Sequence, residues 1–176
     1  MSGHNKWSKI KRQKEKTDSQ KSKIFGKMVR LITVEAKKAG GNVNSPGLKS
    51  AIERARDANV PNDNIERAIK KFSTPGVEIE SVTYEAYGPG GCAMIIEALT
   101  DNRNKAAQEI KFILSKHGCE LAGIGAANWA FERTPAMEWK SKVTIPLSDE
   151  DSQKLEELVD ELEENDEVQS VYTNIE

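Results

Sequence analysis

Positive and negative charges are separated along this chain, and the separation limits what it can fold into. Residues 1–76 hold 18 Lys and Arg against 7 Asp and Glu, a net charge of +11. Residues 77–176 hold 8 against 21, a net charge of −13, so the 176-residue chain carries only −2. Such asymmetry predicts two units with different partners. The turn-type residues at 73–76 place the expected break there, giving domains 1–76 and 77–176.

The composition narrows the class of protein. No apolar run approaches the ~20 residues of a membrane helix, and the N-terminus lacks the apolar stretch of a secretory signal. We therefore expect a cytoplasmic protein that does not enter a membrane. Two cysteines, Cys92 and Cys119, are too few for a disulfide framework or a structural zinc site. We expect buried free thiols, with a redox pair as the alternative, and neither a metal nor another cofactor.

The basic half predicts a polar arm followed by three helices. Residues 1–16 are too polar to fold alone. Apolar spacing predicts helices over 17–39, 45–59 and 61–72, the first ended by Gly40-Gly41 and the second begun by Ser45-Pro46. On the first helix, Lys23, Lys27 and Arg30 fall on the side opposite the apolar face. Three short amphipathic helices suit a small three-helix domain.

We interpret the basic face as a nucleic-acid-binding surface. A solvated surface would interleave acids with the bases, and a membrane-binding helix would carry a Trp- and Phe-rich apolar face. Trp7 either stacks on a base or anchors the arm by burial. The predicted nucleic-acid-binding residues are Lys6, Trp7, Lys9, Lys11, Arg12, Lys14, Lys23, Lys27, Arg30, Arg54, Arg67 and Lys70.

The acidic half predicts an α+β domain. Strands are expected over 82–87, 92–99, 128–131, 138–146 and 168–172, with helices over 100–118 and 149–164. After the first strand the order is β-α-β-β-α-β, typical of a ferredoxin-like fold with both helices on one face of an antiparallel sheet. The extra leading strand is expected to extend an edge of that sheet.

No catalytic constellation stands out in the sequence. Gly88, Pro89, Gly90 and Gly91 lack the Lys and Ser/Thr of a phosphate-binding loop and precede a strand, so they predict a hairpin turn. His4 has no acidic or cysteine partner nearby, and His117 ends a helix. No nucleophile and base are paired, and we expect no enzyme. Asp101, Asn102, Arg103 and Asn104 either cap a helix or form a contact loop.

Four segments, in order, resemble the YebC/PmpR family. They are Ser2-Gly3-His4-Asn5-Lys6-Trp7 with Ile10-Lys11, the stretch 59–69, Tyr84 to Gly91 with Tyr87 inside it, and Asp101 to Lys105. From this resemblance we expect that the family's third α/β domain, inserted between Phe131 and the last helix, is missing here. Ala126 and Ala127 replace the usual Ser-Val pair, and Lys105 replaces an Arg, which loses bidentate phosphate recognition.

The resemblance implies a non-catalytic regulator of gene expression. Family members are described as DNA-binding transcriptional regulators, and others are tied to ribosomes and to translation through difficult stretches. Both readings present phosphates to the basic domain, so both stay open here, with DNA-binding transcription regulation first. For a ribosomal RNA partner, 87–91 and 101–105 are candidate contact loops. The residues leave the oligomeric state open.

Overall fold

The computed structural model describes residues 18–76 and 78–176, in two compact units. The helical unit takes in the described residues up to 80 and residues 135–138, and the α/β unit takes in 81–134 and 139–176. Lys6, Trp7, Lys9, Lys11, Arg12 and Lys14 lie outside the described residues.

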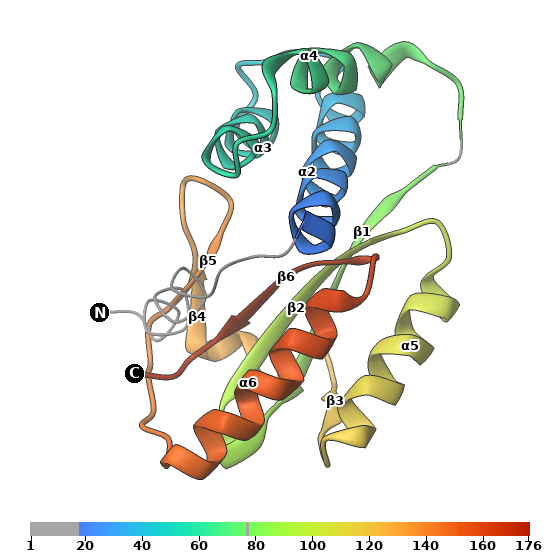
Figure 1. Cartoon of the computed structure of the whole chain (residues 1–176). Helices are drawn as coiled ribbons and strands as arrows, with labels where there is room; N and C mark the ends of the chain where they lie inside the picture. Colours follow the sequence, from blue (N-terminus) through green and yellow to red (C-terminus); the bar gives the residue numbers. More distant parts are fainter. Residues whose placement is uncertain (1–17, 77) are drawn as a thin grey trace. The chain divides into compact units, whose positions relative to one another are not determined.

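Over the residues that the structure describes, the helical unit consists of three helices and a short 3₁₀ turn, and Figure 1 shows how they are arranged. They are α2 (Asp18–Lys38), α3 (Pro46–Asp57), α4 (Asn62–Lys70) and η1 (Lys71–Ser73). The two glycines after α2 have positive φ, and Gly41 N–H donates to Ala36 O at 2.9 Å, which closes the helix as a glycine C-terminal cap does. A side chain on Gly41 would also collide with the Phe72 ring. The three predicted helices are therefore present, with ends shifted by one or two residues.

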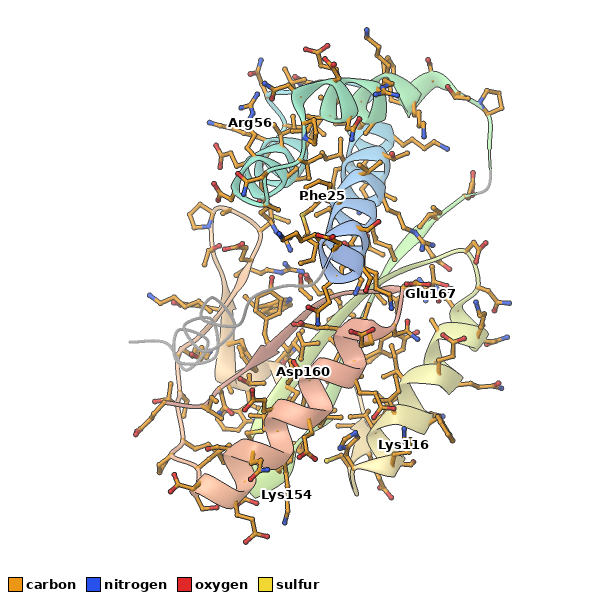
Figure 2. The ribbon with its side chains drawn as sticks, in the orientation of Figure 1. Phe25, Arg56, Lys116, Lys154, Asp160 and Glu167 are labelled. Carbon is orange, nitrogen blue, oxygen red and sulfur yellow. The ribbon has the colours of Figure 1, made fainter. Side chains whose placement is uncertain are left out.

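One apolar cluster holds the helical unit together. Ile32 and Leu48 are fully buried in it, and each of the three helices contributes. Phe25, labelled in Figure 2, packs against the same cluster from α2. The members of the cluster are spaced three or four residues apart on each helix, the spacing that gives a helix a single apolar face.

The α/β unit contains a four-stranded sheet covered on one face by two helices (Figure 1). Its elements are β1 (Glu80–Tyr87), η2 (Pro89–Gly91), β2 (Ala93–Thr100), α5 (Arg103–Lys116), β3 (Glu120–Ala122), η3 (Asn128–Ala130), β4 (Phe131–Arg133), β5 (Trp139–Ser141), α6 (Asp149–Glu164) and β6 (Val168–Thr173). The strand order is β3-β1-β2-β6, and β4 pairs with β5 in a separate two-stranded sheet. Ser148 caps α6 by accepting the Asp151 N–H at 3.1 Å, as predicted.

The α+β class is confirmed, but the predicted strand arrangement is wrong. The leading strand β1 lies between β3 and β2, not at an edge. The segments expected as two strands of the main sheet shrink to β4 and β5, which pair with each other, while β3 was not expected at all. The sheet is therefore not the predicted ferredoxin-like one. Alternation identified strand-forming residues but carried no information about their partners.

The apolar second face of the main sheet explains why β4 and β5 form a separate sheet. Strand β2 is buried on both sides, with Met94 and Ile96 toward the helices and Ala93 and Ile95 toward a second cluster. That second cluster is completed by residues of η3, β4 and β6, and Trp139 of β5 packs against it. Glu97 is bound there by Trp139 Nε1 at 3.0 Å and Arg133 Nη2 at 2.9 Å. The small sheet thus covers apolar surface that water would otherwise reach.

Leu158 tests the packing of α6 on the sheet. It is fully buried, so Leu158→Ala should reduce the free energy of unfolding by about 2–5 kcal/mol through lost transfer energy and a residual cavity. Phe112 of α5 is 67% exposed and provides the control, since Phe112→Ala should change stability by no more than about 0.5 kcal/mol. Urea unfolding followed by far-UV circular dichroism measures both. Equal effects would show that α6 does not pack as described.

Candidate nucleic-acid interface

The predicted basic stripe of α2 lies opposite the apolar face of that helix. Ile32 and Ala36 are in the helical core, and Lys23, Lys27 and Arg30 are about 120–180° from them at ~100° per residue. Lys23 is exposed, whereas Lys27 and Arg30 are half-buried. The Arg30 Nε is buried and has no hydrogen-bond partner within the part of the chain that the structure describes. This stripe is therefore not used to build the helical core.

Apart from Lys49 in the first turn of α3, the basic residues of α3 and α4 occupy helix C-terminal ends. Arg54 and Arg56 are in the last turn of α3, and Arg67 and Lys70 are in the last turn of α4. Cations there interact favourably with the helix dipole, typically by 0.3–1 kcal/mol at exposed sites. Arg56, on α3 in Figure 2, is exposed, as are Arg67 and Lys70. These residues therefore have a structural role that does not exclude phosphate binding.

Two of these arginines also have specific partners inside the helical unit. Arg67 Nη2 donates to Asn64 Oδ1 at 3.0 Å, and its Nε donates to Asp63 O at 3.3 Å. Arg54 Nε lies 3.9 Å from Glu138 Oε1. An ion pair at that distance between partly exposed side chains is weak.

The two candidate contact loops of the α/β unit are not brought together. They flank the eight residues of β2, and at about 3.3 Å per residue they are roughly 26 Å apart. The 88–91 segment is the predicted hairpin turn: Gly88 N–H donates to Cys92 O at 2.8 Å, and Gly90 has φ 70°. A side chain on Gly90 would collide with Leu147, just before α6. This turn is shaped by packing.

Helix capping explains the conformation of most of the 101–105 segment. Asn102 accepts the Lys105 N–H at 3.1 Å, so it is the N-cap of α5. The Lys105 ammonium lies 3.5 Å from Glu167 Oε1 and 3.8 Å from Glu109 Oε1. Two carboxylates therefore compensate the Lys105 charge, which leaves it less available to an external phosphate. The contact role of this segment stays a prediction.

Sequence reasoning missed a polar cluster built around Glu85. This buried carboxylate accepts backbone N–H bonds from Gly125 at 2.6 Å, Ala127 at 3.0 Å and Asn128 at 2.6 Å. It thereby fixes the segment 123–129, which follows β3. The signal in the sequence was Gly123-Ile124-Gly125, where two glycines flank an apolar residue. Glu85 itself looked like an ordinary alternating strand residue.

The titratable groups of the α/β unit form structural contacts. His117 Nε2 lies 2.7 Å from Glu161 Oε2, and Lys116 Nζ lies 2.5 Å from Glu161 Oε1. Hydrogen bonds from Lys116 and His117 lower the pKa of Glu161. Burial raises the pKa of Cys92 to about 12 and also raises that of Cys119. Both thiols are free and buried, as expected.

Across 18–76 and 78–176, no three His, Cys, Asp or Glu side chains cluster as metal ligands would. Among the helices of those same residues, none has the length and apolarity to span a bilayer.

The fold and its charges define a class: a basic helical domain joined to an acidic α+β domain. Matches to models of known protein families identify the family. Residues 5–75 match the TACO1/YebC protein N-terminal domain, and residues 79–141 and 135–175 match the TACO1/YebC second and third domain. The chain therefore belongs to the TACO1/YebC family, and the resemblance noted in its sequence is confirmed.

Curated relatives carry the name "Probable transcriptional regulatory protein". The one from Fervidobacterium nodosum is 37% identical over 235 residues, covering 99% of this chain and 93% of that protein. The one from Thermotoga maritima is 47% identical over 162 residues, covering 90% of this chain and 61% of that protein. An alignment of 235 positions against 176 residues leaves stretches of the relative with no counterpart here, as expected for a missing insert.

A solved structure shares the fold. The crystal structure of a conserved hypothetical protein, Aq1575 from Aquifex aeolicus, has a TM-score of 0.80 and 31% sequence identity. The match covers 93% of this chain and 93% of that chain. The α+β architecture is thus that of a protein already seen in a crystal.

The cysteine environment makes a direct chemical prediction. Because burial keeps Cys92 protonated at neutral pH and only the thiolate reacts rapidly, native protein should react with Ellman's reagent at least tenfold more slowly than protein in 6 M guanidinium. Absorbance at 412 nm follows the reaction. Rapid labelling of both thiols in the native protein would contradict this burial and revive the redox-pair alternative.

Proposed function

We propose that this chain is a non-catalytic, nucleic-acid-binding regulator of gene expression, and that its helical unit binds the phosphates. The observation that supports the proposal most is the position of Lys23, Lys27 and Arg30 opposite the helical core. The names of the relatives, probable transcriptional regulatory proteins, agree with it. DNA is the partner we propose first.

Backbone phosphates are the part of the nucleic acid that this surface suits. Lysine and arginine side chains on a helix neutralise phosphates and release counterions, so affinity falls steeply with salt. Such contacts set orientation and register but do not read sequence. The sequence also predicts Lys6, Lys9, Lys11 and Arg12 as phosphate contacts, and these lie outside the described residues. We therefore propose binding with weak sequence selectivity.

The absence of catalysis in the proposal is supported by how reactive side chains are used. Among the described residues, the histidine His117 is bonded to Glu161 within an ion cluster, and both thiols are buried and protonated. Neither arrangement pairs a nucleophile with a base in the way that covalent catalysis requires.

Charge reversal on α2 tests the proposal. The triple variant Lys23→Glu, Lys27→Glu, Arg30→Glu should bind a labelled 20-base-pair duplex at least 30-fold more weakly at 50 mM salt. If three phosphate contacts are lost, the slope of log affinity against log salt should become less steep by about 2.7. Fluorescence anisotropy over a salt series measures both, and circular dichroism checks the fold.

A matched control reverses three exposed lysines of the α/β unit. Lys111→Glu, Lys140→Glu, Lys142→Glu changes the net charge equally and should leave the salt slope unchanged. Equal losses in both triples, or no binding by the original chain at low salt, would refute the proposal. A DNase-resistant co-sedimentation with ribosomes that the α2 triple abolishes, without duplex binding, would replace DNA by ribosomal RNA.

A further inference from the structure

The 123–129 segment displays apolar side chains on the acidic α/β unit. Ile124, between two glycines, is 101% exposed, Trp129 is 47% exposed and Tyr87 is 38% exposed. Single exposed apolar residues are ordinary on protein surfaces, but grouped ones mark interaction sites. Tyr87 Oη and Trp129 Nε1 both bond to Ala126 O, two residues from Ile124, and we call the three exposed side chains together the 124/129 surface.

The buried carboxylate of Glu85 fixes the backbone of the segment that carries this surface. Burying a carboxylate is costly unless hydrogen bonds satisfy it, and Glu85 accepts three backbone N–H bonds from residues 125, 127 and 128. Charge-assisted bonds of this kind are about twice as strong as neutral ones. The segment is consequently held in one conformation, with Ile124 outside.

The polar ends of the two aromatic rings are occupied by the segment itself. Tyr87 Oη donates to Ala126 O, and Trp129 Nε1 lies 3.0 Å from Tyr87 Oη and 2.9 Å from Ala126 O. With these groups already bonded within the protein, the exposed parts of Tyr87 and Trp129 can offer mainly ring surface. Ring surface attracts apolar groups and cations, particularly the guanidinium of arginine.

Two exposed carboxylates come from the stretches that build the 124/129 surface. Glu120 is opposite Tyr87 in the β1–β3 register, and Glu132, which follows Trp129 by three residues, is opposite Lys140 in the β4–β5 register. The two stretches that build the surface, 78–102 and 118–132, contain no lysine or arginine. A phosphate backbone would be repelled here, whereas a cationic protein segment would be attracted.

We propose that the 124/129 surface docks a basic protein segment in which apolar residues alternate with arginines or lysines. Apolar side chains of the partner would cover Ile124, cations would lie over Trp129 and Tyr87, and Glu120 and Glu132 would pair with further cations at the rim. This goes beyond phosphate binding by the helical unit, since it assigns a second partner of opposite charge to the other unit.

A synthetic peptide tests the proposal with the full-length chain. A fluorescein-labelled peptide of four Arg-Leu-Gly repeats should bind with an anisotropy change, and the double variant Ile124→Ser, Trp129→Ala should weaken that binding at least tenfold. Glu120→Lys, Glu132→Lys should weaken it at least tenfold as well. Peptides of Glu-Leu-Gly or Arg-Ser-Gly repeats should bind at least tenfold more weakly, because each lacks one of the two required features.

Controls elsewhere on the α/β unit separate a site from general attraction. Glu157→Lys, Asp160→Lys reverses two exposed carboxylates of α6 (Asp160 is labelled in Figure 2), and Phe112→Ser removes an exposed ring of α5. Both should change the affinity less than twofold. Equal losses in the site and control variants, or no peptide binding, would overturn the proposal. A dT12 oligonucleotide whose binding needs Ile124 and Trp129 would assign the surface to nucleic acid instead.

These outcomes are independent of the nucleic-acid proposal. The peptide tests charges and rings in residues 87–132, and the duplex tests Lys23, Lys27 and Arg30. Trp129 is bonded to Ala126 O and Tyr87 Oη, so the single variant Ile124→Ser is measured beside the double variant. Ile124 is fully exposed, so its replacement by serine removes no core contact, and that change by itself should weaken peptide binding severalfold.

Discussion

Separation of opposite charges onto two independently packed units is the constraint on which the rest of this structure depends. Residues 1–76 carry +11 and residues 77–176 carry −13, and the described residues 18–76 account for +6 of the former, from 12 Lys and Arg against 6 Asp and Glu. These charges would cancel wherever lysines and carboxylates interleaved. Here each unit has its own apolar core, one around Ile32 and Leu48 and one around Met94 and Ile96. The cores leave the charged side chains outside, and each unit can therefore keep a field of one sign for a partner of the other sign.

Carboxylates in the α/β unit do more than keep the chain in solution. Glu97 is held by Trp139 and Arg133 on the second face of the sheet, and Glu85 organises the segment that carries Ile124.

The β4–β5 hairpin lies where the two family-model matches meet, at residues 135–141. The ends of two antiparallel neighbours are about 5 Å apart, so residues can be added or removed at such a tip without disturbing the sheet.

Sequence reasoning succeeded where a signal was local and failed where it was distant. Helices α2 and α6 were predicted to within one residue because apolar spacing, Gly40-Gly41 and Ser148 with Asp151 all lie within the elements they define. The partners of β4 and β5 depend on covering Ile95, which is more than thirty-five residues away along the chain. The role of Glu85 likewise depends on backbone N–H groups forty residues later. Of the proposed phosphate-binding residues, the structure describes only those from Lys23 onward.

Lysine acetylation footprinting of the intact chain, with and without nucleic acid, tests most directly whether the helical unit binds nucleic acid and the α/β unit does not. Mass spectrometry reports the reactivity of every lysine in one experiment. The account predicts that nucleic acid protects Lys23 and Lys27 severalfold and leaves Lys111, Lys140 and Lys154 of the α/β unit unchanged. Protection that falls on the α/β lysines, or that is uniform over the chain, would contradict the claim that separated charge determines where each partner binds.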